Sequence, residues 1–116
     1  MDVQEFRDYC LAKHAVTEGF PFGEGTLVIK VAGKMFALCG VDKFDFVNLK
    51  CDPERAIQLR EEYPAIQPGY HMHKQQWKSV YMDGSLPRKL VIELINHSCE
   101  LVVKSLPKKV QAELFL

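Results

Sequence analysis

Hydrophobic and polar positions repeat with a helical period in three parts of the chain. These parts are residues 3–15, 52–64 and 85–106. Asp2, Asp52 and Ser85 stand where each helix would begin, and side chains of these types accept hydrogen bonds from a helix's first backbone N–H groups. Pro64 and Pro107 end the second and third helices, since proline cannot continue them. The pattern predicts three helices, with a tail after Pro107 that is compatible with a further turn.

Strand-like runs occupy the space between these helices. TLVIKVA, MFALCGV and FDFVNLKC (26–32, 35–41 and 44–51) are rich in β-branched and aromatic residues, and Gly33-Lys34 predicts a tight turn between the first two runs. The segment TEGFPFGEG (17–25) is rich in Gly and Pro, and this predicts a loop. The stretch 67–84 is bounded by the pairs Pro68-Gly69 and Asp83-Gly84, which predicts one or two further strands between them.

The predicted element order is α-β(3)-α-β(2)-α. Runs of strands between helices are typical of an α+β fold, here a two-layer α/β sandwich with a five-stranded, mainly antiparallel sheet under helices. With 116 residues, 47% hydrophobic and 26% charged, the sequence predicts one soluble domain over residues 1–116.

Charge gives only a weak indication of a partner. Lys+Arg and Asp+Glu both number 15, so the formal net charge is +0. Residues 1–62 hold eight basic and eleven acidic side chains (net −3), and residues 63–116 hold seven and four (net +3). An anionic partner would therefore meet the second half of the chain.

The four cysteines have no C-x-x-C spacing, and the N-terminus resembles no secretory signal. No stretch approaches the roughly 20 apolar residues that span a bilayer. We therefore expect a cytoplasmic protein with reduced, buried thiols and no membrane association.

Metal binding and catalysis have little support in the sequence. His71 and His73 are two residues apart and would share one face of a strand, but zinc needs a third protein ligand that the sequence does not offer nearby. No nucleophile motif such as G-x-S-x-G occurs, and the glycines of 17–25 lack the Lys-Ser/Thr of a P-loop. The sequence predicts no enzyme, no metal and no cofactor.

The segment QPGYHMHKQQWKSVYMDG (67–84) mixes aromatic and basic residues, as nucleic-acid-binding surfaces do. On physical grounds the preferred interpretation is a structural strand pair, with Trp77 and Tyr81 inward and the lysines outward. Arg88 and Lys89 follow at the start of the last helix, whose positive end favours a phosphate.

PGYHMHKQQWKSVYMDGSLP resembles the hallmark of the bacterial MmcQ/YjbR family, and TEGFPFGEGTLVIKVAGKMFALCGV and FDFVNLKCDPERAIQLREEYPAIQPGYHM resemble its earlier segments. The resemblance implies a cytoplasmic domain of the secretion-chaperone-like or frataxin-like type. Members are commonly labelled DNA-binding and credited with a "double wing" motif. His73 and Gln76 depart from the usual Asn and His of the hallmark.

Two functional hypotheses follow from these observations. The first is a non-enzymatic DNA-binding protein, and the second is a protein- or peptide-binding module without a nucleic-acid role. The candidate DNA contacts are the aromatic and basic residues of the hallmark and the next helix start, namely Tyr70, His71, Lys74, Trp77, Lys78, Arg88 and Lys89.

Overall fold

The computed structural model describes residues 1–69 and 76–115 of the chain. Its elements in chain order are α1 (Val3–Leu11), β1 (Val16–Gly19), β2 (Thr26–Val31), β3 (Lys34–Gly40), β4 (Phe46–Lys50), α2 (Pro53–Glu62), β5 (Ile66–Pro68), β6 (Trp77–Tyr81), α3 (Arg88–Ser105) and α4 (Lys108–Phe115).

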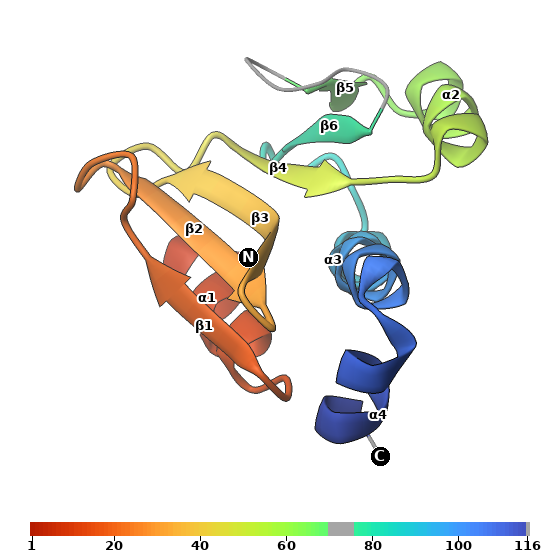
Figure 1. Ribbon diagram of the computed structural model, residues 1–116. Coiled ribbons are helices and arrows are strands. Elements are labelled where there is room, and N and C mark those ends of the chain that lie inside the picture. Colours follow the sequence, from red (N-terminus) through yellow and green to blue (C-terminus); the bar gives the residue numbers. More distant parts are fainter. Residues whose placement is uncertain (70–75, 116) are drawn as a thin grey trace.

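The strands form one six-stranded sheet in the order β1-β2-β3-β4-β6-β5, and every neighbouring pair is antiparallel. In Figure 1, α1 lies behind β1 and β2, and α3 runs beside β3 and β4. The predicted α+β class with an antiparallel sheet under helices is confirmed.

Buried side chains of α1, α2 and α3 form one core with one face of the sheet, which we call the helix-covered face. In β2 this face carries Leu27, Ile29 and Val31, each with 0% of its surface exposed. From α1, Phe6 and Cys10 reach the same core. Burial of these apolar side chains is the main stabilising contribution to the fold.

Two predictions are wrong at the N-terminal edge of the sheet. The sheet has six strands instead of five, and residues 17–19, which were predicted as part of a loop, belong to the edge strand Val16–Gly19. β1 pairs with β2 from Val16↔Val31 to Gly19↔Val28. Glu18 faces α1, where Arg7 holds its carboxylate through two hydrogen bonds of 2.8 Å. The four residues of β1 show little polar–apolar alternation, so the sequence pattern does not predict a strand there. The strand forms because these residues pair with β2.

Helix boundaries also differ from the predictions. The first helix ends at Leu11 instead of Ala15, and Ala15 itself has a φ of 60°, which a right-handed helix does not admit. The long helix begins at Arg88 with Pro87 at its N-cap and no side-chain cap, so Ser85 is not its cap. The tail forms an eight-residue helix, more than one turn. Asp2 and Asp52 cap their helices as predicted.

The β2–β3 turn falls at Ala32-Gly33, one residue before the predicted pair. Both residues have positive φ, 50° and 81°, which is the requirement of a type I′ hairpin turn. Gly33 adopts this conformation without the steric cost that a side chain would bring.

Candidate functional site

The second face of the sheet, which we call the open face, receives no side chain of the helical core cluster. Strand alternation and register assign its residues, which are Thr17, Gly19, Thr26, Val28, Lys30, Met35, Leu38, Gly40, Phe46, Asn48, Lys50, Gln67, Trp77, Ser79 and Tyr81.

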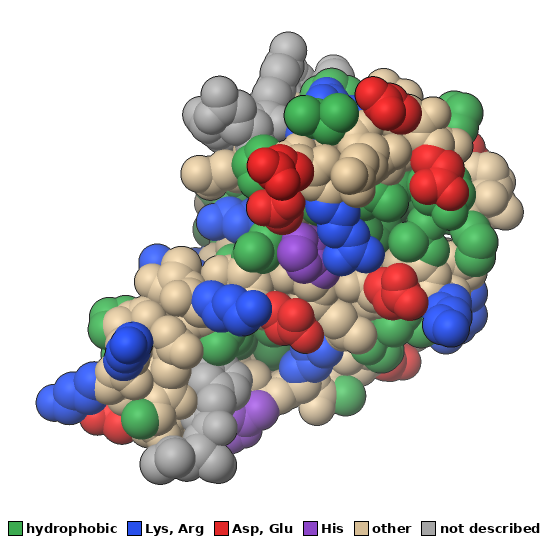
Figure 2. Space-filling view, turned by 90° about the vertical axis from the view of Figure 1, so that its right-hand side faces the viewer, with side chains coloured by type: hydrophobic (Ala, Val, Ile, Leu, Met, Phe, Trp, Pro, Cys, Tyr) green, Lys and Arg blue, Asp and Glu red, His purple; other side chains and the backbone are tan. Residues whose placement is uncertain are grey.

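The charge of the open face is of one sign. Among the strand residues that the structure describes, Lys30 and Lys50 are its charged side chains, and no Asp or Glu projects from it. The helix side contrasts with this face, because basic and acidic side chains alternate over it in Figure 2. Sheet pairing has therefore produced a cationic face on a chain of zero net charge.

Three cross-strand pairs line the open face where β4 meets β6. The rings of Phe46 and Tyr81 have centroids 5.2 Å apart at an interplanar angle of 42°. Ser79 Oγ donates to Asn48 Oδ1 at 2.6 Å. We call these two pairs, together with the third pair, Lys50 and Trp77, the β4–β6 ladder.

The third pair of the ladder is Lys50 and Trp77. The Lys50 ammonium lies 5.4 Å from the centroid of the Trp77 ring, a cation–π contact. Trp77 is only 5% exposed. Trp77 is thus buried as predicted, although alternation from Val80 places it on the open face of the sheet and not among the helices.

Lys78 was predicted to point outward, and this prediction is wrong. It pairs with Leu49 and Pro68 on the helix-covered face and is 4% exposed. Burial lowers its pKa, and the nearby charge of Arg60 lowers it further. Because adjacent strand residues point to opposite faces, Trp77 and Lys78 cannot contact one ligand together.

Arg88 and Lys89 are exposed at the start of α3, as predicted. Arg88 Nη1 is 2.6 Å from a carboxylate oxygen of Glu5 at the start of the chain. A shallow cavity beside Arg88 is also lined by Tyr81 of the ladder. The helix start thus adjoins one end of the open face.

Three candidates, Tyr70, His71 and Lys74, lie outside the described residues, as does His73 of the two-histidine pattern. Elsewhere in the structure, over 1–69 and 76–115, no group of three His, Cys, Asp or Glu side chains is arranged to hold a metal. In the same ranges no helix is both long and apolar enough to cross a membrane.

All four cysteines are buried and free of disulfides. Burial raises the pKa of Cys10 and of Cys39 to about 12, so both thiols stay protonated near neutral pH. Protonated, buried thiols are poor nucleophiles.

Sequence reasoning missed Lys30, Lys50 and Phe46. The run 44–51 was predicted only as a strand, and the structure shows that Phe46 shares a face with Asn48 and Lys50. A stricter count of two-residue spacing back from Lys50 would have found that group. That Tyr81 lies beside Phe46 could be known only from the pairing of β4 with β6.

His97 joins α3 to the start of α2. The backbone N–H of Asp52 donates to His97 Nε2 at 3.2 Å, so this nitrogen is unprotonated. Burial and the charge of Arg55 lower the pKa of His97, against smaller opposite effects from Glu100 and Asp52. The neutral imidazole is therefore the form that fits the fold.

We expect stability to fall as the pH drops below about 6.5, the ordinary histidine pKa, because the unfolded chain then binds a proton that folded His97 binds less readily. Urea unfolding at pH 7.5 and 5.0 measures this loss. His97→Gln should lose less stability between the two pH values than the parent. Equal losses in the parent and His97→Gln would contradict the assignment.

A family model described as YjbR matches residues 11–101. The uncharacterised protein YbdF of Escherichia coli O157:H7 is 42% identical over 93 residues, which cover 79% of this chain and 76% of YbdF. The uncharacterised protein YjbR of Escherichia coli K12 is 33% identical over 110 residues, covering 94% and 93% of the two chains. The crystal structure of Deinococcus radiodurans protein DR2400 superposes with a TM-score of 0.94 at 38% identity, covering 99% of this chain and 88% of that one. A crystal structure from Pseudomonas syringae gives a TM-score of 0.73 at 29% identity, covering 87% and 98%.

Proposed function

The chain belongs to the YjbR family, and on that premise we propose that it is a non-enzymatic DNA-binding protein that contacts DNA with the open face of its sheet. The observation that supports this proposal is the charge of that face, where Lys30 and Lys50 project and the described strands contribute no carboxylate. Phosphate contacts by lysine supply most of the affinity in sequence-independent DNA binding.

The contact surface that we propose differs from the one that the sequence suggested. Lys78 and Trp77 are both buried, so neither is assigned a phosphate or stacking contact. Phosphate contact passes to Lys30 and Lys50, which are only partly buried. Lysine ammonium groups are still the proposed phosphate contacts, but they now belong to side chains that a ligand can reach.

Arg88 and Lys89 extend the proposed surface past Tyr81 to the start of α3. Backbone N–H groups at a helix start favour a phosphate, and α3 has no side-chain cap. Two carboxylates oppose this contact. Glu5 pairs with Arg88, and hydrogen bonds from Ser85 lower the pKa of Asp83 nearby. We therefore assign the main contacts to the open face.

A salt-titrated binding assay tests the proposal. Fluorescence anisotropy with labelled DNA should show saturable binding at low salt that weakens as salt rises. Lys30→Gln with Lys50→Gln should weaken binding and reduce the slope of log K against log salt by about 2, one for each phosphate contact.

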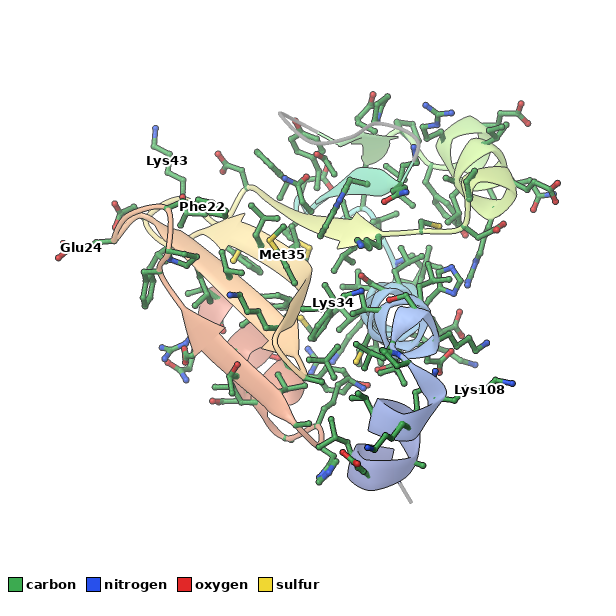
Figure 3. All side chains as sticks on the ribbon, viewed as in Figure 1. Phe22, Glu24, Lys34, Met35, Lys43 and Lys108 are labelled. Carbon is green, nitrogen blue, oxygen red and sulfur yellow. The ribbon has the colours of Figure 1, made fainter. Side chains whose placement is uncertain are left out.

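The matched control is Lys34→Gln with Lys108→Gln, which removes the same charge. Lys34 lies at the end of the helix-covered face, 3.5 Å from Ser105, and Lys108 points away from the sheet in Figure 3. This control should keep the parent slope. Absence of saturable binding at low salt, or equal losses in the two double variants, would refute the proposal.

A second candidate, a protein- or peptide-binding module, is favoured by one observation. Phe20 and Phe22 are 45% and 67% exposed on the loop between β1 and β2. Figure 3 places Phe22 at the same end of the sheet as Glu24 and Lys43. Exposed aromatic rings beside charged residues are typical of protein contact sites. A purified chain that binds no DNA but captures a specific protein, and loses it on Phe22→Ser, would favour this candidate.

A further inference from the structure

We infer that two copies of this chain associate through β1, whose antiparallel pairing joins their six-stranded sheets into one continuous sheet. The inference goes beyond the proposed function and does not depend on DNA binding. In the described sheet β1 is an end strand, with β2 on one side of it. The outer side of an end strand presents backbone groups that can pair with a further strand.

The backbone groups of β1 that point to this outer side belong to Val16 and Glu18. The Ala32 N–H donates to Ala15 O at 2.9 Å, and this bond sets the phase of the pairing between β1 and β2. Alternate residues of an antiparallel strand direct their N–H and C=O to the same neighbour, so Thr17 bonds to β2 as Ala15 does. Val16 and Glu18 direct theirs the other way, where a second strand can bond to them.

The register that matches these groups in two copies has Thr17 at its centre. When Val16 faces Glu18 of the second copy, about four backbone hydrogen bonds can form, and Thr17 meets its own equivalent on the two-fold axis. Thr17 is exposed on the open face, and threonines that face each other on neighbouring strands are a favourable pair. A register centred on Glu18 would instead oppose two carboxylates, which is unfavourable.

Exposed apolar side chains flank β1 at both of its ends. Of the four large hydrophobic side chains that are exposed in the described structure, three lie here, since Leu11 precedes the strand and Phe20 and Phe22 follow it. Antiparallel pairing brings the end of one strand to the start of the other, so the two rings come to the end that carries Leu11 of the second copy. The two-fold axis repeats this contact, and burial of apolar surface drives association.

The charges around β1 favour a second copy as the partner. Glu18 is the charged residue of β1, and Arg7 balances it within each copy through two hydrogen bonds of 2.8 Å. Lys13 precedes the strand and Glu24 follows it, so antiparallel pairing brings Lys13 of one copy to the end that carries Glu24 of the other. Figure 3 shows Glu24 projecting from the β1–β2 loop in a different direction from Lys43.

The opposite edge of the sheet is less suited to such pairing. β5 has three residues and ends at Pro68, whose nitrogen carries no hydrogen. β1, with the sequence VTEG, contains neither proline nor lysine, the residues that commonly protect an edge strand. The contrast between the two edges therefore favours β1.

The same arrangement enlarges the open face. A two-fold axis that relates antiparallel neighbours runs perpendicular to the sheet, so the open faces of both copies lie on one side. Lys30 and Lys50 of the two copies then belong to one cationic surface. A dimer would offer DNA about twice the phosphate contacts of a single chain.

Sedimentation velocity of the full chain, from about 1 to about 300 µM, measures the self-association. We expect a monomer at the lowest concentration and a dimer at the highest, as is usual for a small interface. Thr17→Lys places two ammonium groups opposite each other on the axis and should raise the dissociation constant about 10-fold or more. Thr17→Val keeps a β-branched side chain and should dimerise as the parent does.

Matched controls separate the edge from the rest of the surface. Gln67→Lys adds the same charge to the open face at the opposite edge and should leave the dimer intact. Phe22→Ser should weaken the dimer by about 10-fold, whereas Ile57→Ser, which removes an exposed side chain from α2, should not. Thermal unfolding shows whether each variant folds. If Thr17→Lys does not, the comparison of Phe22→Ser with Ile57→Ser still tests the interface.

Amide hydrogen exchange gives a second measurement, at the strand itself. The N–H groups of Val16 and Glu18 should exchange more slowly as the protein concentration rises, whereas that of Thr17, bonded to β2, should change little. A chain that stays monomeric at about 300 µM would overturn the inference. A dimer that Thr17→Lys leaves unchanged, or one that does not slow exchange at Val16 and Glu18, would overturn it equally.

Discussion

The Ser98→Ala variant is expected to unfold with a free energy about 2–4 kcal/mol below that of the parent, because the N–H of Lys50 and the C=O of Phe36 lose their hydrogen-bond partner. Ser98 lies in α3 with 0% of its surface exposed. Its hydroxyl accepts from the N–H of Lys50 at 2.8 Å and donates to the C=O of Phe36 at 2.5 Å.

The position of Ser98 explains the size of this effect. β3 and β4 pair only from Ala37↔Leu49 to Cys39↔Val47. Just beyond that register, one hydroxyl connects both strands to the helix. Alanine fills the space but provides no donor or acceptor, and a buried unpaired backbone group costs about 1–3 kcal/mol.

Urea unfolding at pH 7.5 measures the change, with Ser105→Ala as the matched control. Ser105 belongs to the same helix and donates only to Val102 O, one turn back at 2.6 Å. Its side chain is exposed, so the control should lose less than about 1 kcal/mol. Similar losses in the two variants would mean that the bridge contributes little.

Gly69→Ala is expected to destabilise the chain by about 1–3 kcal/mol through overpacking. A Cβ built on Gly69 would lie 2.8 Å from both Cβ and the carbonyl oxygen of Trp77. The contacted carbonyl oxygen belongs to the Trp77 backbone, which cannot rotate away as the end of a side chain can. The Gly69 N–H also donates to this oxygen at 2.9 Å. The strands β5 and β6 would have to separate to admit the methyl group.

Gly25→Ala is the control for this second prediction. Nothing lies within 4 Å of a Cβ built there, and Gly25 has no positive φ, so the variant should match the parent or be slightly more stable. Thermal unfolding of both variants gives the comparison. A Gly69→Ala variant with the same thermal unfolding midpoint as the parent would contradict the prediction, since β5 and β6 would then admit the methyl group at no cost.

This contact gives the Pro-Gly of the hallmark segment a structural reason. Gly69 permits the close approach of β5 to Trp77, and Trp77 supports Lys50 on the open face. The hallmark thus contributes to the proposed site through packing. Its Lys78 faces the helices instead of a ligand.

Periodicity along the chain was sufficient for the helices and for most of the sheet. Asp52 before Pro53 predicted the start of α2, and the β-branched run at 26–31 predicted β2. These features depend on neighbouring residues, so a local pattern carries them. Val16–Gly19 escaped prediction because its strand exists only through pairing with β2.

The local order of polar and apolar residues was enough to establish the α+β class, two of the helix caps and the hairpin between β2 and β3. The open face needed more, because a strand's alternation says which residues share a face but not which face the helices cover. That choice arose when α1, α2 and α3 packed on Leu27, Ile29 and their neighbours, leaving Lys30 and Lys50 on the other side. The ladder depends on pairing between β4 and β6, some 30 residues apart in sequence, and contacts of that range come from packing, not from local pattern.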